Sequence, residues 1–217
     1  MSAADFYTRW AHLYDHVSRS IPGIAGLRRQ TAHALDLELG DTVIEMGCGT
    51  GANLAFLREQ VGPEGSVVGV DFSDGVLQRA RTHVENEGWE NVHLVRGDAR
   101  SPPLGGADAV VATFVIGMFA DPEQVVGEWC AFVGSGGNIA LLNAARSSRW
   151  YGPLVNLPFR GFVLVSTPGK RRLDEPAHVL LDERVATGHA AVERRCERTV
   201  HDDGALGLVR LTAGRVL

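Results

Sequence analysis

Cysteine is scarce in this chain of 217 residues, and its three cysteines, Cys48, Cys130 and Cys196, are widely separated. This spacing provides neither the close pairs of a disulfide framework nor a cluster of metal ligands. We therefore expect a protein of a reducing compartment, the cytoplasm, with no bound metal.

Long apolar runs are also missing. No run approaches the ~20 residues that a membrane-spanning helix needs, and the amino terminus lacks the basic and then apolar pattern of a signal peptide. The net charge of −5 disfavours broad binding to nucleic acid. A hydrophobic content of 45% is sufficient for one globular domain, which we expect to cover residues 1–217.

Residues 43–54 carry the most informative pattern, a buried strand that leads into a glycine-rich turn and then into helical spacing. Glycine recurs at alternate positions, Gly47, Gly49 and Gly51, which frees the backbone for positive φ and lets a ligand approach the main chain. Strand, turn and helix start together form a nucleotide-type site at the carboxyl edge of a sheet. Glu45 enters the turn, where its carboxylate would repel a pyrophosphate but suit an ammonium group. A tight turn without a ligand is the alternative.

An acid, Asp71, ends the next predicted strand, about 20 residues after the last glycine of the turn. A carboxylate at this place can accept hydrogen bonds from both hydroxyls of a ribose. Capping of the following helix is the alternative role for Asp71, but Ser73 and Asp74 are available for that role. Phe72 follows and is expected to pack on an adenine.

The Glu-x-Gly-x-Gly-x-Gly spacing resembles motif I of the class I S-adenosylmethionine (SAM) methyltransferases and differs from the Gly-x-Gly-x-x-Gly of dinucleotide-binding folds. The resemblance implies that SAM is the cofactor and that the turn wraps its methionine end. Gly97-Asp98-Ala99 resembles motif II of the same family, where Asp98 would accept the exocyclic amine of adenine and the Ala99 amide would donate to the ring. An ordinary Gly-Asp turn is the alternative there. Thr113, at the end of the fourth predicted strand, stands where these enzymes contact the cofactor.

The amino-terminal residues 4–19 have helical spacing, and their text Tyr-x-x-Trp-Ala-x-x-Tyr-Asp resembles the signature of the UbiE-type (ubiquinone/menaquinone) branch. In that branch such a segment closes over the cofactor as a lid, so Tyr14 is expected to reach the methionine moiety. A helix packed on the core is the alternative. The expected cofactor-binding residues are thus Tyr14, Glu45, Gly47, Cys48, Gly49, Thr50, Gly51, Asp71, Phe72, Asp98, Ala99 and Thr113.

The order of predicted elements indicates a Rossmann-like, doubly wound sheet of seven strands, mostly parallel, with a C-terminal antiparallel hairpin and helices on both faces. The first predicted helix, residues 24–37, is expected to turn Arg28 and Arg29 toward water. The last predicted helix covers residues 175–191. The hairpin is expected from strands at residues 193–200 and 206–211 around the turn Asp202-Asp203-Gly204.

Residues 144–174 form an apolar and basic insertion, expected on the substrate side. No acidic residue occurs from 129 to 173. The six basic residues there are Arg146, Arg149, Arg160, Lys170, Arg171 and Arg172. Such a segment suits a membrane surface or an anionic lipid. A substrate lid and the interface of a homodimer are the alternatives.

Methyl transfer from a sulfonium depends mainly on alignment and on exclusion of water. A general base is needed only where the proton of the acceptor must leave early, and the candidates are His12, His16, Tyr151 and His178. His12 and His16 share a helix face, but no third metal ligand accompanies them.

The expected reaction is methylation of an apolar small molecule. The UbiE-like signature and the apolar residues 114–119, which would line an apolar pocket or begin a buried helix, favour a menaquinone or ubiquinone precursor as the acceptor. Phospholipid N-methylation of the phosphatidylethanolamine type and O- or N-methylation of a specialised metabolite are alternatives. A SAM-binding protein without catalysis is the alternative of another class.

Overall fold

The computed structural model describes residues 23–157, 161 and 177–217. The predicted lid at residues 4–19, with Tyr14, His12 and His16, lies outside the described residues, as does most of the insertion after residue 157.

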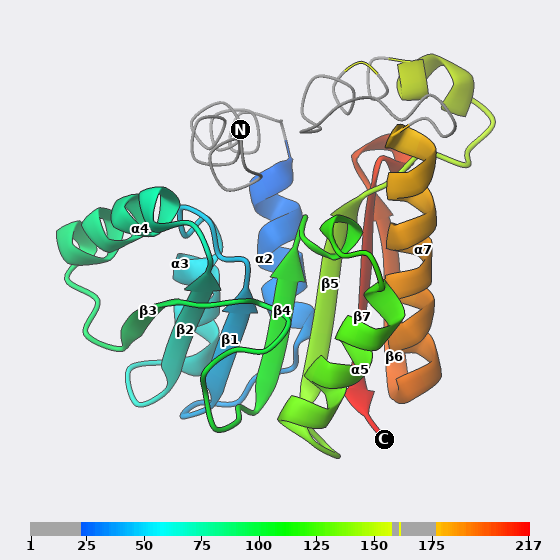
Figure 1. Ribbon diagram of the computed structural model, residues 1–217. Helices are drawn as coiled ribbons and strands as arrows, with labels where there is room; N and C mark the ends of the chain where they lie inside the picture. Colours follow the sequence, from blue (N-terminus) through cyan, green and yellow to red (C-terminus); the bar gives the residue numbers. More distant parts are fainter. Residues whose placement is uncertain (1–22, 158–160, 162–176) are drawn as a thin grey trace.

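The described residues form one seven-stranded sheet in the order β3-β2-β1-β4-β5-β7-β6 (Figure 1). Five strands are parallel: β1 (Thr42–Met46), β2 (Ser66–Asp71), β3 (Val92–Arg96), β4 (Ala109–Thr113) and β5 (Asn138–Ala144). The last two, β6 (Cys196–Gly204) and β7 (Val209–Val216), pair antiparallel at the edge beside β5. The predicted fold is confirmed.

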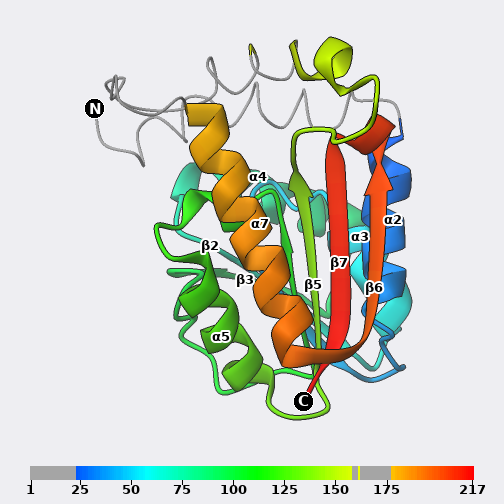
Figure 2. The same cartoon turned by 90° about the vertical axis from the view of Figure 1, so that its right-hand side faces the viewer.

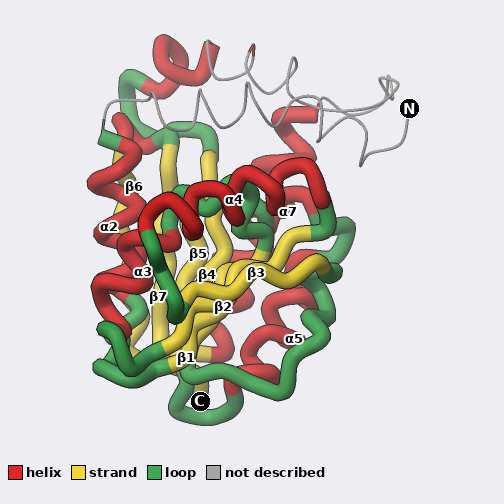
Figure 3. Tube along the Cα trace, turned by 90° about the vertical axis from the view of Figure 1, so that its left-hand side faces the viewer, coloured by secondary structure: helices red, strands yellow, loops and turns green. Residues whose placement is uncertain are grey.

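Helices cover both faces of the sheet, as Figures 2 and 3 show from opposite sides. One apolar layer packs under α2 (Ile24–Ala34), α3 (Leu54–Val61) and α4 (Asp74–Glu87). The other packs under α5 (Pro122–Val133) and α7 (Ala177–Arg195), with Trp129 of α5 fully buried. Within the described part of the chain, no helix has both the length and the apolar character to span a membrane.

The central strand β4 shows how the sequence determines the sheet. All five of its residues are buried, as expected for a parallel strand that is covered by helices on both faces. Asp121 then begins α5 by accepting a hydrogen bond from the Gln124 amide at 3.0 Å, and Pro122 occupies the first helical turn.

The C-terminal hairpin differs from the prediction. Helix α7 continues to Arg195, Asp202-Asp203-Gly204 lies in β6, and the turn is the short helix η2 (Ala205–Gly207). The reason lies in packing, because a Cβ at Gly204 would overlap the Leu27 side chain of α2. This glycine permits a close approach of a helix and does not mark a turn.

The apolar residues 114–119 leave β4 abruptly. Phe114 has φ of +60°, and the short helix η1 (Ile116–Met118) follows. Ile116 is fully buried and Gly117 packs under Leu181 of α7. The middle of the segment is therefore core, as the buried-helix alternative holds, whereas Met118 is exposed.

Candidate functional site

The carboxyl ends of β1, β2 and β4 lie at one edge of the sheet and carry Glu45, Asp71 and Thr113. The glycine turn after β1 is held against β2, since the amides of Gly47 and Cys48 both donate to the Val70 carbonyl, at 2.8 and 2.9 Å. Topology thus brings three of the predicted residues and the turn together.

The glycines of the turn differ in what surrounds them. Gly47, Gly49 and Gly51 all have positive φ, which other residues rarely adopt. A Cβ at Gly47 would lie 2.5 Å from Val115, whereas one at Gly49 would meet no atom of the described residues within 4 Å. Gly47 therefore permits close packing within the protein, and Gly49 faces open space where a ligand can lie against the backbone.

Cys48 lies under the turn and contacts the backbone of β2, because a Cβ at Gly69 would be 2.8 Å from its sulfur. Burial raises the pKa of the Cys48 thiol well above its ordinary value, and the neighbouring Glu45 and Asp71 raise it further. The thiol is protonated and packs against β2, and a cofactor contact by Cys48 stays a prediction.

Asp71 already uses both carboxylate oxygens in the protein. One accepts from the Gly49 amide at 3.0 Å and the other from the Ser73 amide at 2.9 Å, while Ser73 makes no side-chain cap. Asp71 therefore does hold the start of α4, contrary to the expectation that Ser73 and Asp74 would do so. Burial raises the pKa of Asp71, and these backbone hydrogen bonds oppose the rise. The Phe72 amide also contributes to holding this carboxylate, and binding of a ribose by Asp71 remains a prediction.

A buried polar cluster, which we call the Glu45 cluster, consists of Glu45, Asn53, Thr113 and Arg28. The Asn53 amide donates to Glu45 Oε1 and, at 2.8 Å, to Thr113 Oγ1. Arg28 Nη1 donates to Asn53 Oδ1 at 2.8 Å. The cluster connects α2, β1, β4 and the start of α3 directly beneath the glycine turn.

Arg28 corrects the expectation that it faces water. Its side chain is only 7% exposed and its guanidinium lies 5.4 Å from the centre of the Phe114 ring, whereas Arg29 is exposed. A usable signal was present in the sequence, because Arg28 is spaced four and seven residues from the buried Ile24 and Leu35. Asn53 was also missed, since an asparagine at a helix start is ordinarily a cap.

Glu45 is the electrostatic centre of the site. It is 1% exposed, and within the described part of the chain its Oε2 has no hydrogen-bond partner. Desolvation by burial raises the pKa of Glu45 to about 7, although the hydrogen bond from Asn53 and the charge of Arg28 lower it. A carboxylate beside a guanidinium matches the ammonium and carboxylate of an α-amino acid, so these residues fit the methionine end of SAM.

The predicted adenine contacts lie beside the end of β2, where the Gly97 amide donates to the Asp71 carbonyl at 3.0 Å. Asp98 is exposed and pairs with Arg100 at 2.5 Å, and the hydrogen bonds from Arg100 lower the pKa of Asp98. The Ala99 carbonyl is fixed by the indole Nε1 of Trp129 at 2.7 Å. Phe72 is partly exposed. The adenine roles remain predictions.

Two of the candidates for a general base, Tyr151 and His178, are among the described residues, and both lie outside β1, β2 and β4. Tyr151 makes an edge contact with the Trp150 ring after β5. His178 lies in the first turn of α7, near Asp182, which accepts a hydrogen bond from the Arg146 amide at 2.9 Å. A catalytic role for either stays a prediction.

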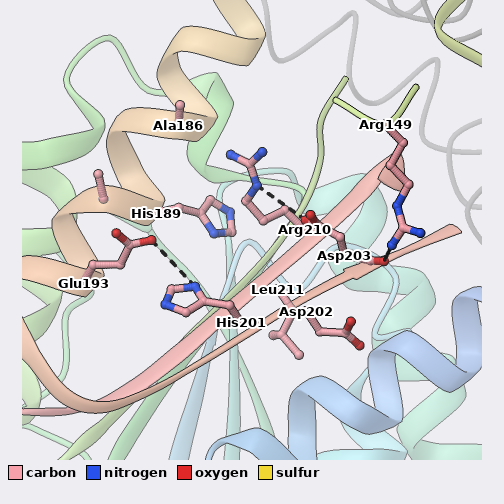
Figure 4. A pocket seen from close by; sticks show the side chains of 10 residues that line it. Arg149, Ala186, His189, Glu193, His201, Asp202, Asp203, Arg210 and Leu211 are labelled. Carbon is pink, nitrogen blue, oxygen red and sulfur yellow. Dashed lines mark hydrogen bonds and ion pairs between the residues drawn. The ribbon is translucent and has the colours of Figure 1, made fainter. Parts of the chain in front are cut away.

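A cavity of about 450 Å³ lies away from these residues, between α7 and the β6–β7 hairpin (Figure 4). His189 projects from α7 and contacts Thr212 Oγ1 at 2.7 Å and Asn143 Oδ1 at 3.2 Å. His201 Nδ1 lies 3.6 Å from a Glu193 carboxylate oxygen, and an ion pair joins Arg210 to Asp203. Neither the Glu45 cluster nor any predicted cofactor residue lines this cavity.

Comparison with known proteins identifies the family of this chain. Residues 43–137 match a family described as a methyltransferase domain. The chain is 36% identical over 151 residues to a phosphatidylethanolamine N-methyltransferase of Cereibacter sphaeroides, covering 68% of this chain and 70% of that protein. It is 33% identical over 121 residues to the demethylmenaquinone methyltransferase of Shouchella clausii strain KSM-K16, covering 55% of this chain and 52% of that protein.

Solved structures resemble the whole fold. A SAM-dependent methyltransferase from Aquifex aeolicus superposes with a TM-score of 0.64 at 17% identity, covering 90% of this chain and 94% of that one. Human N-acetylserotonin methyltransferase in complex with SAM has a TM-score of 0.64 at 20% identity, covering 99% of this chain and 56% of that one. At such identities the likeness concerns the fold.

Proposed function

Because the chain belongs to the class I SAM-dependent methyltransferases, we propose that it methylates the amine of a phosphatidylethanolamine-type lipid. SAM, the cofactor of this class, supplies an electrophilic methyl group on its sulfonium. The protein contributes by binding SAM and the acceptor, by aligning the acceptor atom with the methyl group, and by excluding water.

The observation that carries the proposal is the match to the phosphatidylethanolamine N-methyltransferase. That match covers 151 residues and is longer than the stretch, residues 43–137, that matches the methyltransferase-domain family. The demethylmenaquinone relatives match over a shorter stretch, and the chain spans about half of their length.

The chemistry of the acceptor is compatible with the site. A primary amine must be neutral to attack, but it needs no base that removes a proton early. In the proposed complex, Glu45 and Arg28 bind the amino-acid end of the cofactor and Asp71 binds its ribose. Asp98 and Ala99 contact the adenine, and Phe72 stacks on it. Thr113 positions Asn53 and Glu45 through the hydrogen bonds of the Glu45 cluster.

A quinone precursor is the second candidate, the acceptor that the sequence favours. The demethylmenaquinone methyltransferases among the relatives and the UbiE-like amino-terminal signature support it. Here a phenolic or carbon acceptor gains more from a general base, for which Tyr151 and His178 are candidates.

The test is expression in a bacterial host that makes no phosphatidylcholine, followed by lipid analysis. We expect methylated phosphatidylethanolamines with the wild type and none with Asp71→Asn, while the exposed neighbour variant Asp74→Asn behaves like the wild type. Unchanged phospholipids, together with methylation of demethylmenaquinone by the purified protein, would transfer the assignment to the quinone class. Binding of SAM without methylation of either acceptor would contradict both.

A further inference from the structure

The helical residues 152–157, after β5, turn two leucines outward, and the turn before them does the same with a tryptophan. Trp150, Leu154 and Leu157 are spaced by four and three residues and are 91%, 78% and 70% exposed. The opposite side carries the buried Gly152 and Asn156. This arrangement reverses that of an ordinary surface helix, whose apolar side faces the core. We call these three exposed residues the Trp150 surface.

The Trp150 surface is built on a fixed support. Asn156 clamps the backbone of Ser147 from both sides, accepting from its amide at 2.8 Å and donating to its carbonyl at 3.0 Å. Ser147 Oγ donates to the Leu206 carbonyl in the β6–β7 turn at 2.8 Å. The buried polar contacts therefore hold the helix in an orientation that presents its apolar side chains outward.

Among the described residues, a basic side chain, Arg149, adjoins the Trp150 surface. Arg149 is exposed and immediately precedes Trp150, and it reaches the Asp203 carbonyl with one guanidinium nitrogen at 3.5 Å. The sequence from 129 to 173 contains six basic residues and no acid, although the whole chain has a net charge of −5. An apolar surface with basic neighbours suits the interface of an anionic bilayer, where aromatic and aliphatic side chains enter the lipid and arginines meet phosphate.

The position of the surface also suits a lipid substrate. In Figures 1 and 2 the short helix, drawn in yellow-green, lies at the end of the molecule toward which β4 and β5 point. That is the edge at which the Glu45 cluster and the glycine turn lie. A bilayer bound there would face the same edge as the cofactor site.

We propose that the Trp150 surface is a membrane-docking site that inserts into bilayers containing anionic lipid. The proposal rests on the proposed function, since a phospholipid acceptor must be reached in its bilayer, but its test requires no methyl transfer. An isolated exposed apolar residue is common on proteins. Here Trp150 of the turn and Leu154 and Leu157 of the clamped helical residues are exposed together, and Arg149 is their immediate neighbour.

The experiment is flotation of the full chain with vesicles made of equal parts phosphatidylglycerol and phosphatidylcholine, compared with vesicles of phosphatidylcholine alone. We expect the wild type to bind the anionic vesicles. Simultaneous Trp150→Ser, Leu154→Ser and Leu157→Ser substitutions should weaken that binding by at least about tenfold. The matched control is Leu39→Ser, since Leu39 is 80% exposed in the turn before β1 and outside the Trp150 surface. It should bind like the wild type.

Trp150 fluorescence provides a second measurement. A blue shift with anionic vesicles that is lost in Trp150→Phe would support insertion. Equal flotation of the triple variant and the wild type would overturn the proposal. So would a concentration-dependent dimer that the triple variant abolishes while vesicle binding is absent, because the surface would then cover a second copy. Vesicle binding through this surface without methylated lipid would instead contradict the proposed function alone.

Discussion

At Glu45, folding favours the neutral carboxyl, whereas binding of an ammonium group favours the ionised carboxylate. Burial favours its neutral form, and its Oε2, which has no partner among the described residues, would be stabilised in the ionised form by a cation brought to it. The protein holds this carboxyl in place through Asn53 and Thr113. We interpret Glu45 as a group whose cost in stability is recovered when a ligand with an ammonium group binds.

Stability should therefore depend on pH through Glu45. Its pKa is raised from 4.5 to about 7, so its contribution to stability is fully present below 4.5 and is lost as the pH rises through about 7. Between these limits, wild type should lose about 3 kcal/mol of unfolding free energy relative to Glu45→Gln. Urea unfolding of both proteins across this interval measures the difference, and parallel pH dependences would contradict the assignment.

Cofactor binding should release protons through the same group. An ammonium beside Glu45 favours the ionised carboxylate, so SAM binding near pH 7 should expel a fraction of a proton and strengthen as the pH rises. Calorimetry in buffers of different ionisation enthalpy measures this release. It should disappear in Glu45→Gln and persist in Asp74→Asn. Release that is unchanged in Glu45→Gln would place the ammonium elsewhere.

At the scale of elements, the glycine turn separates packing from ligand contact. Gly47→Ala places a Cβ against Val115 in addition to its positive φ, whereas Gly49→Ala meets only the backbone strain. We expect Gly49→Ala to cost about 1 kcal/mol of stability, and Gly47→Ala at least about 1 kcal/mol more.

The same pair should have different effects on binding. The added methyl at Gly49 enters the open space where the cofactor is expected. In Gly49→Ala, the loss of SAM-binding free energy should therefore exceed the loss of unfolding free energy. Chemical denaturation and calorimetry on both variants test this. Equal stability of the two variants, or unchanged SAM affinity in Gly49→Ala, would exclude this division of roles.

Helix α7 is anchored to β5 and β7 through a buried histidine. Burial lowers the pKa of His189 from 6.5 to about 3, with smaller contributions from Arg210 and His201, so the imidazole is neutral. The stability that this lowered pKa confers is fully present above pH 6.5 and is lost as the pH falls toward 3. The loss amounts to about 5 kcal/mol of unfolding free energy.

The corresponding variant is His189→Gln. It should be less stable than wild type at neutral pH, because Thr212 and Asn143 lose good partners, but its stability should fall less steeply on acidification. Acid unfolding followed by circular dichroism measures the slopes, with the exposed His33→Gln as the control. A slope as steep as that of wild type would show that other groups cause the acid sensitivity.

At the scale of the whole molecule, ligand binding and folding are linked. A ligand that binds α2, β1, β2 and β4 together must stabilise all of them against unfolding. S-adenosylhomocysteine at a hundredfold excess over its Kd should add about 2.7 kcal/mol. For a chain of this size this is a rise in Tm of about 5–10 °C.

Thermal unfolding with and without S-adenosylhomocysteine measures this linkage. Asp71→Asn should lose most of the shift, and NAD should produce none with the wild type, because the glycine spacing does not suit a dinucleotide. A larger shift with NAD than with S-adenosylhomocysteine would overturn the cofactor assignment.

Much of the fold could be predicted because its signals are local. Apolar strands that alternate with segments of helical spacing predict the parallel sheet. The spacing from the glycine turn to Asp71 predicts that both lie at the same edge of that sheet. The predicted turn at Asp202-Asp203-Gly204 was wrong. Gly204 is needed where the Leu27 side chain packs against β6, and Leu27 is far away in the sequence. Local turn preferences do not contain that information.

The sequence by itself thus determined the sheet, the class of enzyme and the glycine turn, since each depends on residues that are neighbours along the chain. Only the tertiary structure decided that Arg28 turns inward to join Asn53, Thr113 and Glu45, and that Asp71 also holds α4. It also decided that Trp150, Leu154 and Leu157 face outward. The physical reason is that burial, and with it the pKa of Glu45 and the cost or gain of each polar contact, is set by segments that meet only after folding.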